Sequence, residues 1–186
     1  MSQTILLVPG FWEGAAPFAD VSSRLQAKGS QTRVALLPST GTTSPGNPSM
    51  EDDFAAIRQE VSGPVDAKQE IIMVLHSGGS FLGSNAIEGL TAQGSKIGVP
   101  HMVFLAGAVF PEGFEHSPLP FYDIKDGALV CKSPEQLLFK DLSTDEQEEW
   151  AKKLNSQPAE RWYGKVTYCG WREVPSAYLV CEGDQL

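Results

Sequence analysis

Cysteine, basic residues and long apolar runs are all scarce in this 186-residue sequence, and each scarcity excludes a class of protein. The three cysteines, Cys131, Cys169 and Cys181, follow no C-x-x-C or Cys/His metal spacing, which argues against a disulfide framework or a structural zinc site. No apolar run approaches the roughly 20 residues of a membrane span, and the first residues lack the basic and apolar regions of a signal peptide. We therefore expect a cytoplasmic protein with reduced thiols and no bound metal.

Lysine and arginine number 14 against 23 aspartates and glutamates, so the formal net charge is −9. This balance disfavours binding to nucleic acid or to an anionic membrane, because both need clustered positive charge. Hydrophobic residues make up 41% of the chain and charged residues 20%, which is typical of a globular protein with one well-buried core. No nucleotide, flavin or metal motif is present, so we expect no cofactor.

Short apolar runs alternate with segments of helical periodicity through the first 110 residues. The pattern predicts strands at 4–8, 32–37, 71–75 and within 98–109, and helices at 16–27, 50–61 and 81–90. Such alternation indicates an α/β fold with a doubly wound, mostly parallel sheet. Residues 111–171 are interrupted by proline and rich in aromatic residues, with one amphipathic helix at 144–154, which predicts an inserted helical cap. A last strand at 178–181 returns to the sheet, so the core comprises residues 1–110 and 172–186.

A serine follows the buried strand at 71–75, within the sequence Leu-His-Ser-Gly-Gly-Ser of residues 75–80. A serine held at a sharp strand-to-helix turn needs small neighbours, and Gly78 and Gly79 meet that need. Leu75 replaces the usual first glycine of the G-x-S-x-G pattern. The segment predicts a nucleophile elbow with Ser77 at its apex. The alternative is an ordinary glycine-rich turn whose serine caps the next helix.

Three loops are expected to meet beyond the carboxyl ends of the strands, at residues 9–14, 76–80 and 182–184. A serine nucleophile needs a base, usually a histidine oriented by a carboxylate, and Asp184 fits the role of that acid. Developing oxyanion charge needs two backbone N–H donors, which Gly78 and a residue near Phe11 would supply. The alternative for Asp184 is an acid that merely ends a strand near the surface.

In order and spacing these segments resemble the α/β-hydrolase superfamily, in the branch of hydroxynitrile lyases, plant methyl-ester esterases and uncharacterised fungal and bacterial AB hydrolase-1 domain proteins. The likeness rests on Leu-Leu-Val-Pro-Gly-Phe-Trp at 6–12, the Asp-Asp pair at 52–53, the elbow, and the stretch from Val-Pro-Ser at 174–176 to Glu-Gly-Asp at 182–184. It implies Ser77 as nucleophile, Asp184 as triad acid, and the N–H groups of Phe11 and Gly78 as the oxyanion hole. The implied substrate is a small-molecule ester or related carbonyl compound.

In that family a helix, a last strand, a loop with the catalytic histidine and a closing helix follow the acid, whereas this sequence ends at Leu186. We therefore expect a C-terminally truncated fold that lacks the last strand and helix, and weak serine-esterase activity. A non-catalytic ligand-binding or interaction protein and a truncated gene product stay open, as does self-association through an uncovered sheet edge. A cyanohydrin lyase is a weaker alternative, because the lysine expected near such a site has no counterpart here.

All three histidines, His76, His101 and His116, precede Asp184. His76 is expected to be a packing residue and His101 to lie at the opposite end of the sheet. His116 enters the cap and is interpreted as a solvated loop histidine, with a place over Ser77 as the alternative. Trp12, His116 and Phe121 are the candidates for the wall of a substrate pocket, although Trp12 could equally pin the loop that carries it.

Overall fold

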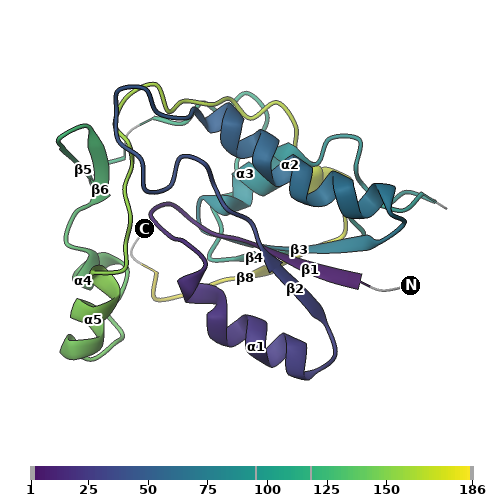
Figure 1. Cartoon of the computed structure of the whole chain (residues 1–186), viewed down its shortest axis with the longest axis horizontal. Helices are drawn as coiled ribbons and strands as arrows, with labels where there is room; N and C mark the ends of the chain where they lie inside the picture. Colours follow the sequence, from purple (N-terminus) through teal and green to yellow (C-terminus); the bar gives the residue numbers. More distant parts are fainter. Residues whose placement is uncertain (1–2, 95, 118, 185–186) are drawn as a thin grey trace.

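The computed structural model describes residues 3–94, 96–117 and 119–184. Its larger sheet has the strand order β2-β1-β3-β4-β8 (Figure 1). Every neighbouring pair in this sheet is parallel. The strands are β1 (Gln3–Val8), β2 (Gln31–Val34), β3 (Glu70–His76), β4 (Met102–Leu105) and β8 (Ser176–Leu179). The parallel α/β sheet predicted from the alternation of elements is confirmed.

Helices lie on both faces of this sheet, with α2 and α3 on one face and α1 on the other (Figure 1). Ser49 begins α2 with a capping box, in which its side chain accepts from the Asp52 N–H and the Asp52 carboxylate accepts from the Ser49 N–H. The helical elements that accompany this sheet are η1 (Ala16–Phe18), α1 (Ala19–Ala27), α2 (Met50–Asp66), α3 (Gly79–Ala86) and the short turn η2 (Gly170–Arg172).

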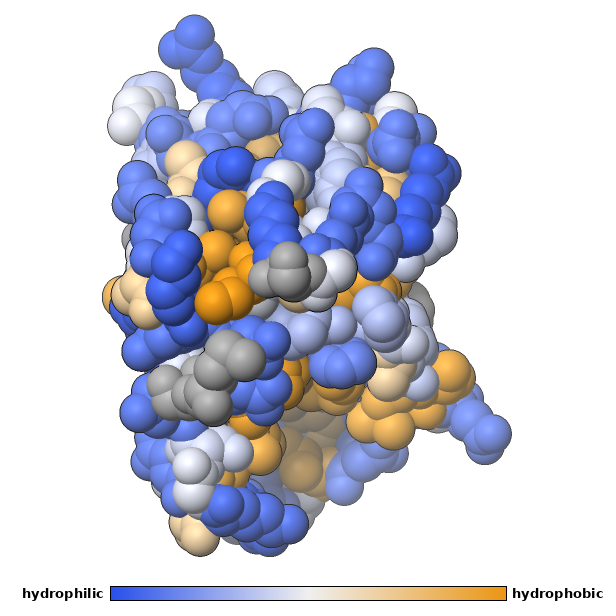
Figure 2. All heavy atoms as spheres, turned by 90° about the vertical axis from the view of Figure 1, so that its right-hand side faces the viewer, coloured by the Kyte–Doolittle hydropathy of each residue, from blue (hydrophilic) through white to orange (hydrophobic). Residues whose placement is uncertain are grey.

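The two faces of the sheet are unequally covered. On β3 the side chains that pack with the core beneath α2 and α3 are fully buried, whereas the alternate ones, among them Ile72 and Val74, are half-buried. Helix α1 has no buried residue, and Tyr178, Leu179 and Val180 at the β8 edge are 49–68% exposed. Figure 2 shows apolar side chains in a hollow in the lower part of its view. The side of the sheet that carries α1 is therefore incompletely covered.

Between β4 and β8 the chain forms a smaller antiparallel sheet in the order β5-β6-β7. Its strands are β5 (Tyr122–Lys125), β6 (Ala128–Cys131) and β7 (Gln157–Pro158), and the segment also holds α4 (Pro134–Leu137) and α5 (Thr144–Ala151). The helix predicted at 144–154 is present as α5, but sequence reasoning missed the hairpin. The Asp126-Gly127 turn, with φ of +47° and +76°, was the available signal.

Several predicted boundaries shift by a few residues. The strand predicted at 32–37 ends at Val34, because Leu36 is turned to solvent and Pro38 follows. The strand predicted within 98–109 narrows to β4, and the one at 178–181 begins earlier, at Ser176. The helix predicted at 81–90 spans 79–86, and α2 continues beyond its predicted end to Asp66.

Candidate active site

Ser77 lies at the turn from β3 to α3 with a φ of +47°, a left-handed conformation that residues other than glycine rarely adopt. Its N–H donates to the carbonyl of Leu105, and its own carbonyl accepts from the N–H groups of Ser80 and Ala108. These bonds hold the strained residue in place, and its side chain is half-buried. A serine on such a strained strand-to-helix turn has the backbone geometry of a nucleophile elbow.

Glycines allow the elbow to pack closely against its surroundings. A Cβ on Gly79 would lie 2.2 Å from a backbone carbonyl oxygen of the loop after β1, and one on Gly10 would lie 2.8 Å from the Cβ of Ser77. The side chain of Leu75, which replaces the usual first glycine, packs against Gly83 of α3. A Cβ on Gly83 would lie 2.5 Å from Leu75 Cδ2. The departure from G-x-S-x-G is therefore compensated within the next helix.

Phe11 and Gly78, the two residues whose N–H groups were predicted to bind an oxyanion, lie on adjacent segments. Val8 is paired with Leu75, so the loop after β1 emerges beside the elbow. A Cβ on Gly78 would lie 2.6 Å from the Phe11 ring. Within the described ranges of the chain, neither N–H donates a hydrogen bond to another group. Two unpaired donors near a strained serine are what a developing oxyanion requires.

An aromatic cluster, defined as Phe11, Phe81, His116 and Trp162, joins the elbow to the inserted segment. The Phe11 ring centroid lies 4.7 Å from that of Trp162, 5.4 Å from that of His116 and 6.0 Å from that of Phe81. The Trp162 side chain is almost fully buried. The cluster gives the site an apolar wall where the inserted segment meets the sheet.

His116 is buried, with 8% of its surface exposed, so the prediction of a solvated loop histidine is wrong. Its Nε2 shares a hydrogen bond of 3.1 Å with the Tyr122 hydroxyl. Burial lowers the pKa of His116 to about 4, which keeps the ring neutral near neutral pH. Its place among aromatic rings explains the burial that sequence reasoning missed.

Trp12 is pinned by the inserted segment. It has a φ of +65°, its N–H donates to Gln157 Oε1 at 3.2 Å, and its carbonyl accepts from the Asn155 N–H at 2.8 Å. Its indole N–H donates to the Leu129 carbonyl at 2.9 Å. The Phe121 ring lies against the Trp12 ring, with centroids 6.3 Å apart. These contacts favour the interpretation that Trp12 holds the loop after β1.

An ion pair that sequence reasoning missed lies beside the elbow. His76 Nδ1 is 2.9 Å from Glu13 Oε2, and the same oxygen accepts from the Gly10 N–H at 2.8 Å. Burial lowers the pKa of His76, but the hydrogen bond and charge of Glu13, with the charge of Asp184, outweigh it and raise that pKa above its ordinary value. The available signal was an acid within the loop at 9–14, which was already expected to face the crevice.

Asp184 lies in a turn after β8, where its N–H donates to the Cys181 carbonyl at 3.0 Å. His76 ends β3 and Asp184 follows β8, and the strands from β3 to β8 are parallel, so both residues lie at the same end of the sheet. The charge of Asp184 contributes to the raised pKa of His76. The exposed His101 precedes β4 and lies at the opposite end, as predicted.

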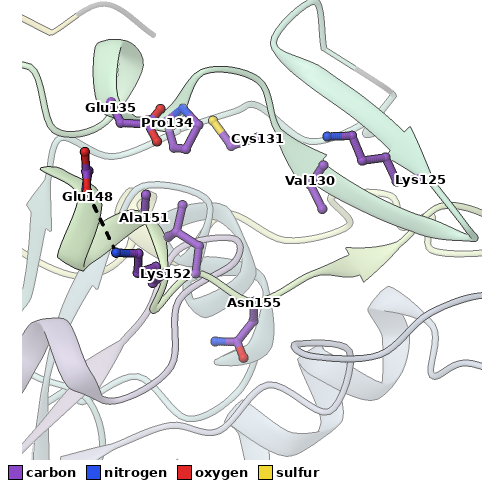
Figure 3. Close-up of a pocket in the computed structure, with 10 residues that line it drawn as sticks. Lys125, Val130, Cys131, Pro134, Glu135, Glu148, Ala151, Lys152 and Asn155 are labelled. Atoms are coloured by element: carbon purple, nitrogen blue, oxygen red, sulfur yellow. Dashed lines mark ion pairs between the residues drawn. The ribbon is translucent and has the colours of Figure 1, made fainter.

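A separate cavity of about 490 Å³ lies in the inserted segment between the β5-β6 hairpin and helices α4 and α5 (Figure 3). Its charged groups partly neutralise one another, with Lys152 Nζ 3.9 Å from Glu148 Oε2. Burial, with the nearby charge of Glu135, raises the pKa of Cys131 to about 11. The lining residues are Lys125, Val130, Cys131, Pro134, Glu135, Glu148, Ala151, Lys152, Leu154 and Asn155. None of them was a predicted site residue.

Among the residues that the structure describes, no group of three or more His, Cys, Asp or Glu side chains could hold a metal ion. No helix in the described ranges is long and apolar enough to cross a membrane.

Comparison with known proteins places the chain in a family. A family model described as "Alpha/beta hydrolase family" matches residues 5–186. The alpha/beta hydrolase nvfD of Aspergillus novofumigatus is 25% identical over an alignment that covers 99% of this chain and 79% of that protein. The probable hydrolase R7 of a Phoma species is 27% identical, with 98% of this chain and 78% of that protein covered.

A solved structure shows the same fold. An extracellular alpha/beta-hydrolase from a Paenibacillus species matches with a TM-score of 0.70 at 14% identity, over 96% of this chain and 76% of that one. The family match covers nearly the whole sequence and includes β1, the elbow and β8. The chain belongs to the alpha/beta hydrolase family.

Proposed function

We propose that this chain is a serine hydrolase that acts on small carboxylic esters or related carbonyl compounds, with Ser77 as its nucleophile. The observation that carries the proposal is the strained backbone of Ser77, at a φ of +47°, beside the unpaired N–H groups of Phe11 and Gly78. The aromatic cluster supplies an apolar wall suited to the organic part of an ester.

In the proposed reaction Ser77 Oγ attacks the ester carbonyl carbon and forms a new C–O bond. The carbonyl π electrons move to the oxygen, which accepts hydrogen bonds from the N–H groups of Phe11 and Gly78. Collapse of this intermediate breaks the bond to the alcohol oxygen, which leaves with the proton that Ser77 Oγ gave up, and an acyl-Ser77 ester remains. Water then attacks that ester, one of its protons returns to Ser77 Oγ, and the carboxylic acid leaves. Asp184 is proposed as the acid that orients the base in a complete triad.

The three histidines within these 186 residues are not arranged as that base. His116 bonds to Tyr122, His76 bonds to Glu13, and His101 lies at the other end of the sheet. Removing the histidine of a serine triad lowers turnover by several orders of magnitude. We therefore propose that the 186-residue polypeptide turns esters over slowly, and that deacylation is the slower step.

An activated ester tests this proposal, because a good leaving group lowers the need for a base in acylation but not in deacylation. With a p-nitrophenyl alkanoate we expect a burst of at most one nitrophenolate per chain, a slow steady rate, and an acyl adduct in the intact mass. Rapid steady turnover would contradict the slow-turnover proposal. Linear release without any adduct would contradict the role of Ser77.

A ligand-binding protein is the second candidate, favoured by the engagement of His76 and His116 in other contacts. Such a protein would keep the apolar wall and the oxyanion donors without the chemistry. An ester that raises the melting temperature, while no product and no adduct form, would favour this candidate over the hydrolase.

A further inference from the structure

The Glu13 carboxylate links the two segments from which the proposed reaction is built. One of its oxygens, Oε2, accepts from the Gly10 N–H at 2.8 Å and is bonded to His76 Nδ1 at 2.9 Å. Gly10 directly precedes Phe11, and His76 directly precedes Ser77. A single oxygen atom therefore bridges the residue before the oxyanion donor and the residue before the nucleophile.

The carboxylate also lies near the reacting hydroxyl. A Cβ built on Gly10 would lie 3.2 Å from Glu13 Oε2 and 3.3 Å from Ser77 Oγ, so both oxygens border the space beside Gly10 where a side chain would stand. The Glu13 side chain is only 17% exposed, which limits its alternative positions. Movement of Glu13 would thus change the spacing between the loop after β1 and the elbow.

The charge of Glu13 needs a counter-charge at this place, because a lone carboxylate would repel a developing oxyanion. His76 supplies it when protonated. The groups that face His76 are Glu13 from the loop after β1, Asp184 from the turn after β8, and the Phe18 ring at a centroid distance of 6.2 Å. Both acids favour the protonated ring, so the Glu13–His76 pair is neutral below the raised pKa of His76 and carries one negative charge above it.

We infer that Glu13 is a positioning residue for the reaction of Ser77: it fixes the spacing between Ser77 and the Phe11 N–H through its bonds to His76 and Gly10. This inference rests on the proposed function, since it needs Ser77 to react. It assigns Glu13 no contact with substrate. It predicts that the shape of the Glu13 side chain matters at every pH, whereas its charge matters only where His76 is neutral.

The test is the second-order rate constant for covalent labelling of Ser77 by an alkyl fluorophosphonate, measured on the 186-residue chain by intact mass. Glu13→Ala removes both bonds and should lower the rate constant at least about tenfold, because a misplaced oxyanion donor costs that much or more. Glu13→Gln keeps an acceptor oxygen of the same shape and should stay within about threefold of wild type at pH about 6. Glu112→Ala, which breaks the exposed Arg172–Glu112 pair of 2.9 Å elsewhere, is the matched control and should leave the rate unchanged.

A pH series separates positioning from a general loss of structure. Glu13→Gln removes the charge of Glu13, and burial, which is the largest influence on His76, then outweighs the remaining charge of Asp184 and lowers the pKa of His76. The variant pair therefore stays neutral, whereas the wild-type pair gains a negative charge as the pH rises. The ratio of the Glu13→Gln rate constant to the wild-type one should therefore increase from pH about 6 to about 9. A merely structural role would lower both rates in parallel with the melting temperature.

The outcomes distinguish the two proposals. If wild type is labelled and the Glu13→Ala variant reacts equally fast, the inference is overturned and the proposed function stands. Unlabelled wild type would overturn both, because no reaction would remain for Glu13 to serve. A slowed Glu13→Ala variant, an active Glu13→Gln variant and a rising ratio would support the inference.

Discussion

The Gly79→Ala variant should lose about 4 kcal/mol or more of unfolding free energy, which is a large fraction of the stability of a typical domain. A Cβ at this position would lie 2.2 Å from the Pro9 carbonyl oxygen and 2.8 Å from that of Val8. Both atoms belong to the backbone where β1 ends, so neither can rotate away as the end of a side chain would. The elbow and β1 must therefore separate to admit one methyl group.

The measurement is urea unfolding followed by tryptophan fluorescence and by circular dichroism. Gly14→Ala is the matched control, because Gly14 lies in the loop after β1 that Gly79 packs against, and the nearest atom to its Cβ would be 3.8 Å away, at Asn155 Nδ2. We expect this control to change the unfolding free energy by no more than about 0.5 kcal/mol. Equal stability of the two variants would show that β1 and the elbow do not pack as described.

The Asp53→Ala variant should be destabilised by about 3 kcal/mol, through groups that are left unpaired in the interior. The fully buried Asp53 carboxylate accepts from the Ser39 N–H at 3.0 Å, the Ser39 hydroxyl at 2.7 Å and the Trp162 indole N–H at 2.9 Å. Burial raises the pKa of Asp53, while these hydrogen bonds act to lower it. Asp53 thus ties α2 to the segment that precedes it, at Ser39, and to Trp162 of the aromatic cluster.

Asp52→Ala is the control for this variant, because it removes a neighbouring acid that lies at the surface and caps α2. Loss of the capping box should cost about 1 kcal/mol. Urea unfolding followed by both probes should therefore show a larger loss of unfolding free energy for Asp53→Ala than for Asp52→Ala. A cost for Asp53→Ala no greater than for Asp52→Ala would contradict the buried network.

The sheet was predictable because its strands are continuous apolar runs separated by helical periods. Each run ends at a clear turn signal, such as Pro9-Gly10 or the small residues after His76. The turn at Ser77 was predictable for a related reason: only small residues fit where two strands and a helix crowd together. Its conformation, with φ at +47°, agrees with that expectation.

The contacts of the buried acids were not predicted, although the position of Asp53 in the sequence indicates that its side chain faces the core. It lies three residues after Met50 and four before Ile57, on the apolar stripe of α2, but sequence reasoning used it only in the Asp-Asp pair on which the family likeness rests. Its partners Ser39 and Trp162 are distant in sequence, so no local pattern shows them. The same holds for Glu13, which is separated from His76 by 63 positions.

The inserted segment was predicted least well because its stability comes from long-range contacts. Trp12 is held there by Leu129, Asn155 and Gln157, all more than 110 residues away along the chain. Hairpin strands of four residues are also too short for a clear periodic signal. The buried state of His116 follows from rings that only the fold brings together.

Covalent labelling of the purified chain with a fluorophosphonate, followed by intact-mass and peptide analysis, tests the central claim that Ser77 is the nucleophile. It compares wild type with Ser77→Ala, and with Ser80→Ala as a control that removes a buried neighbouring hydroxyl bonded to the Leu75 carbonyl. We expect one label per chain on the peptide that contains Ser77, lost in Ser77→Ala and kept in Ser80→Ala. Folded wild type that takes up no label, or a label that persists in Ser77→Ala, would contradict the role of Ser77 as nucleophile.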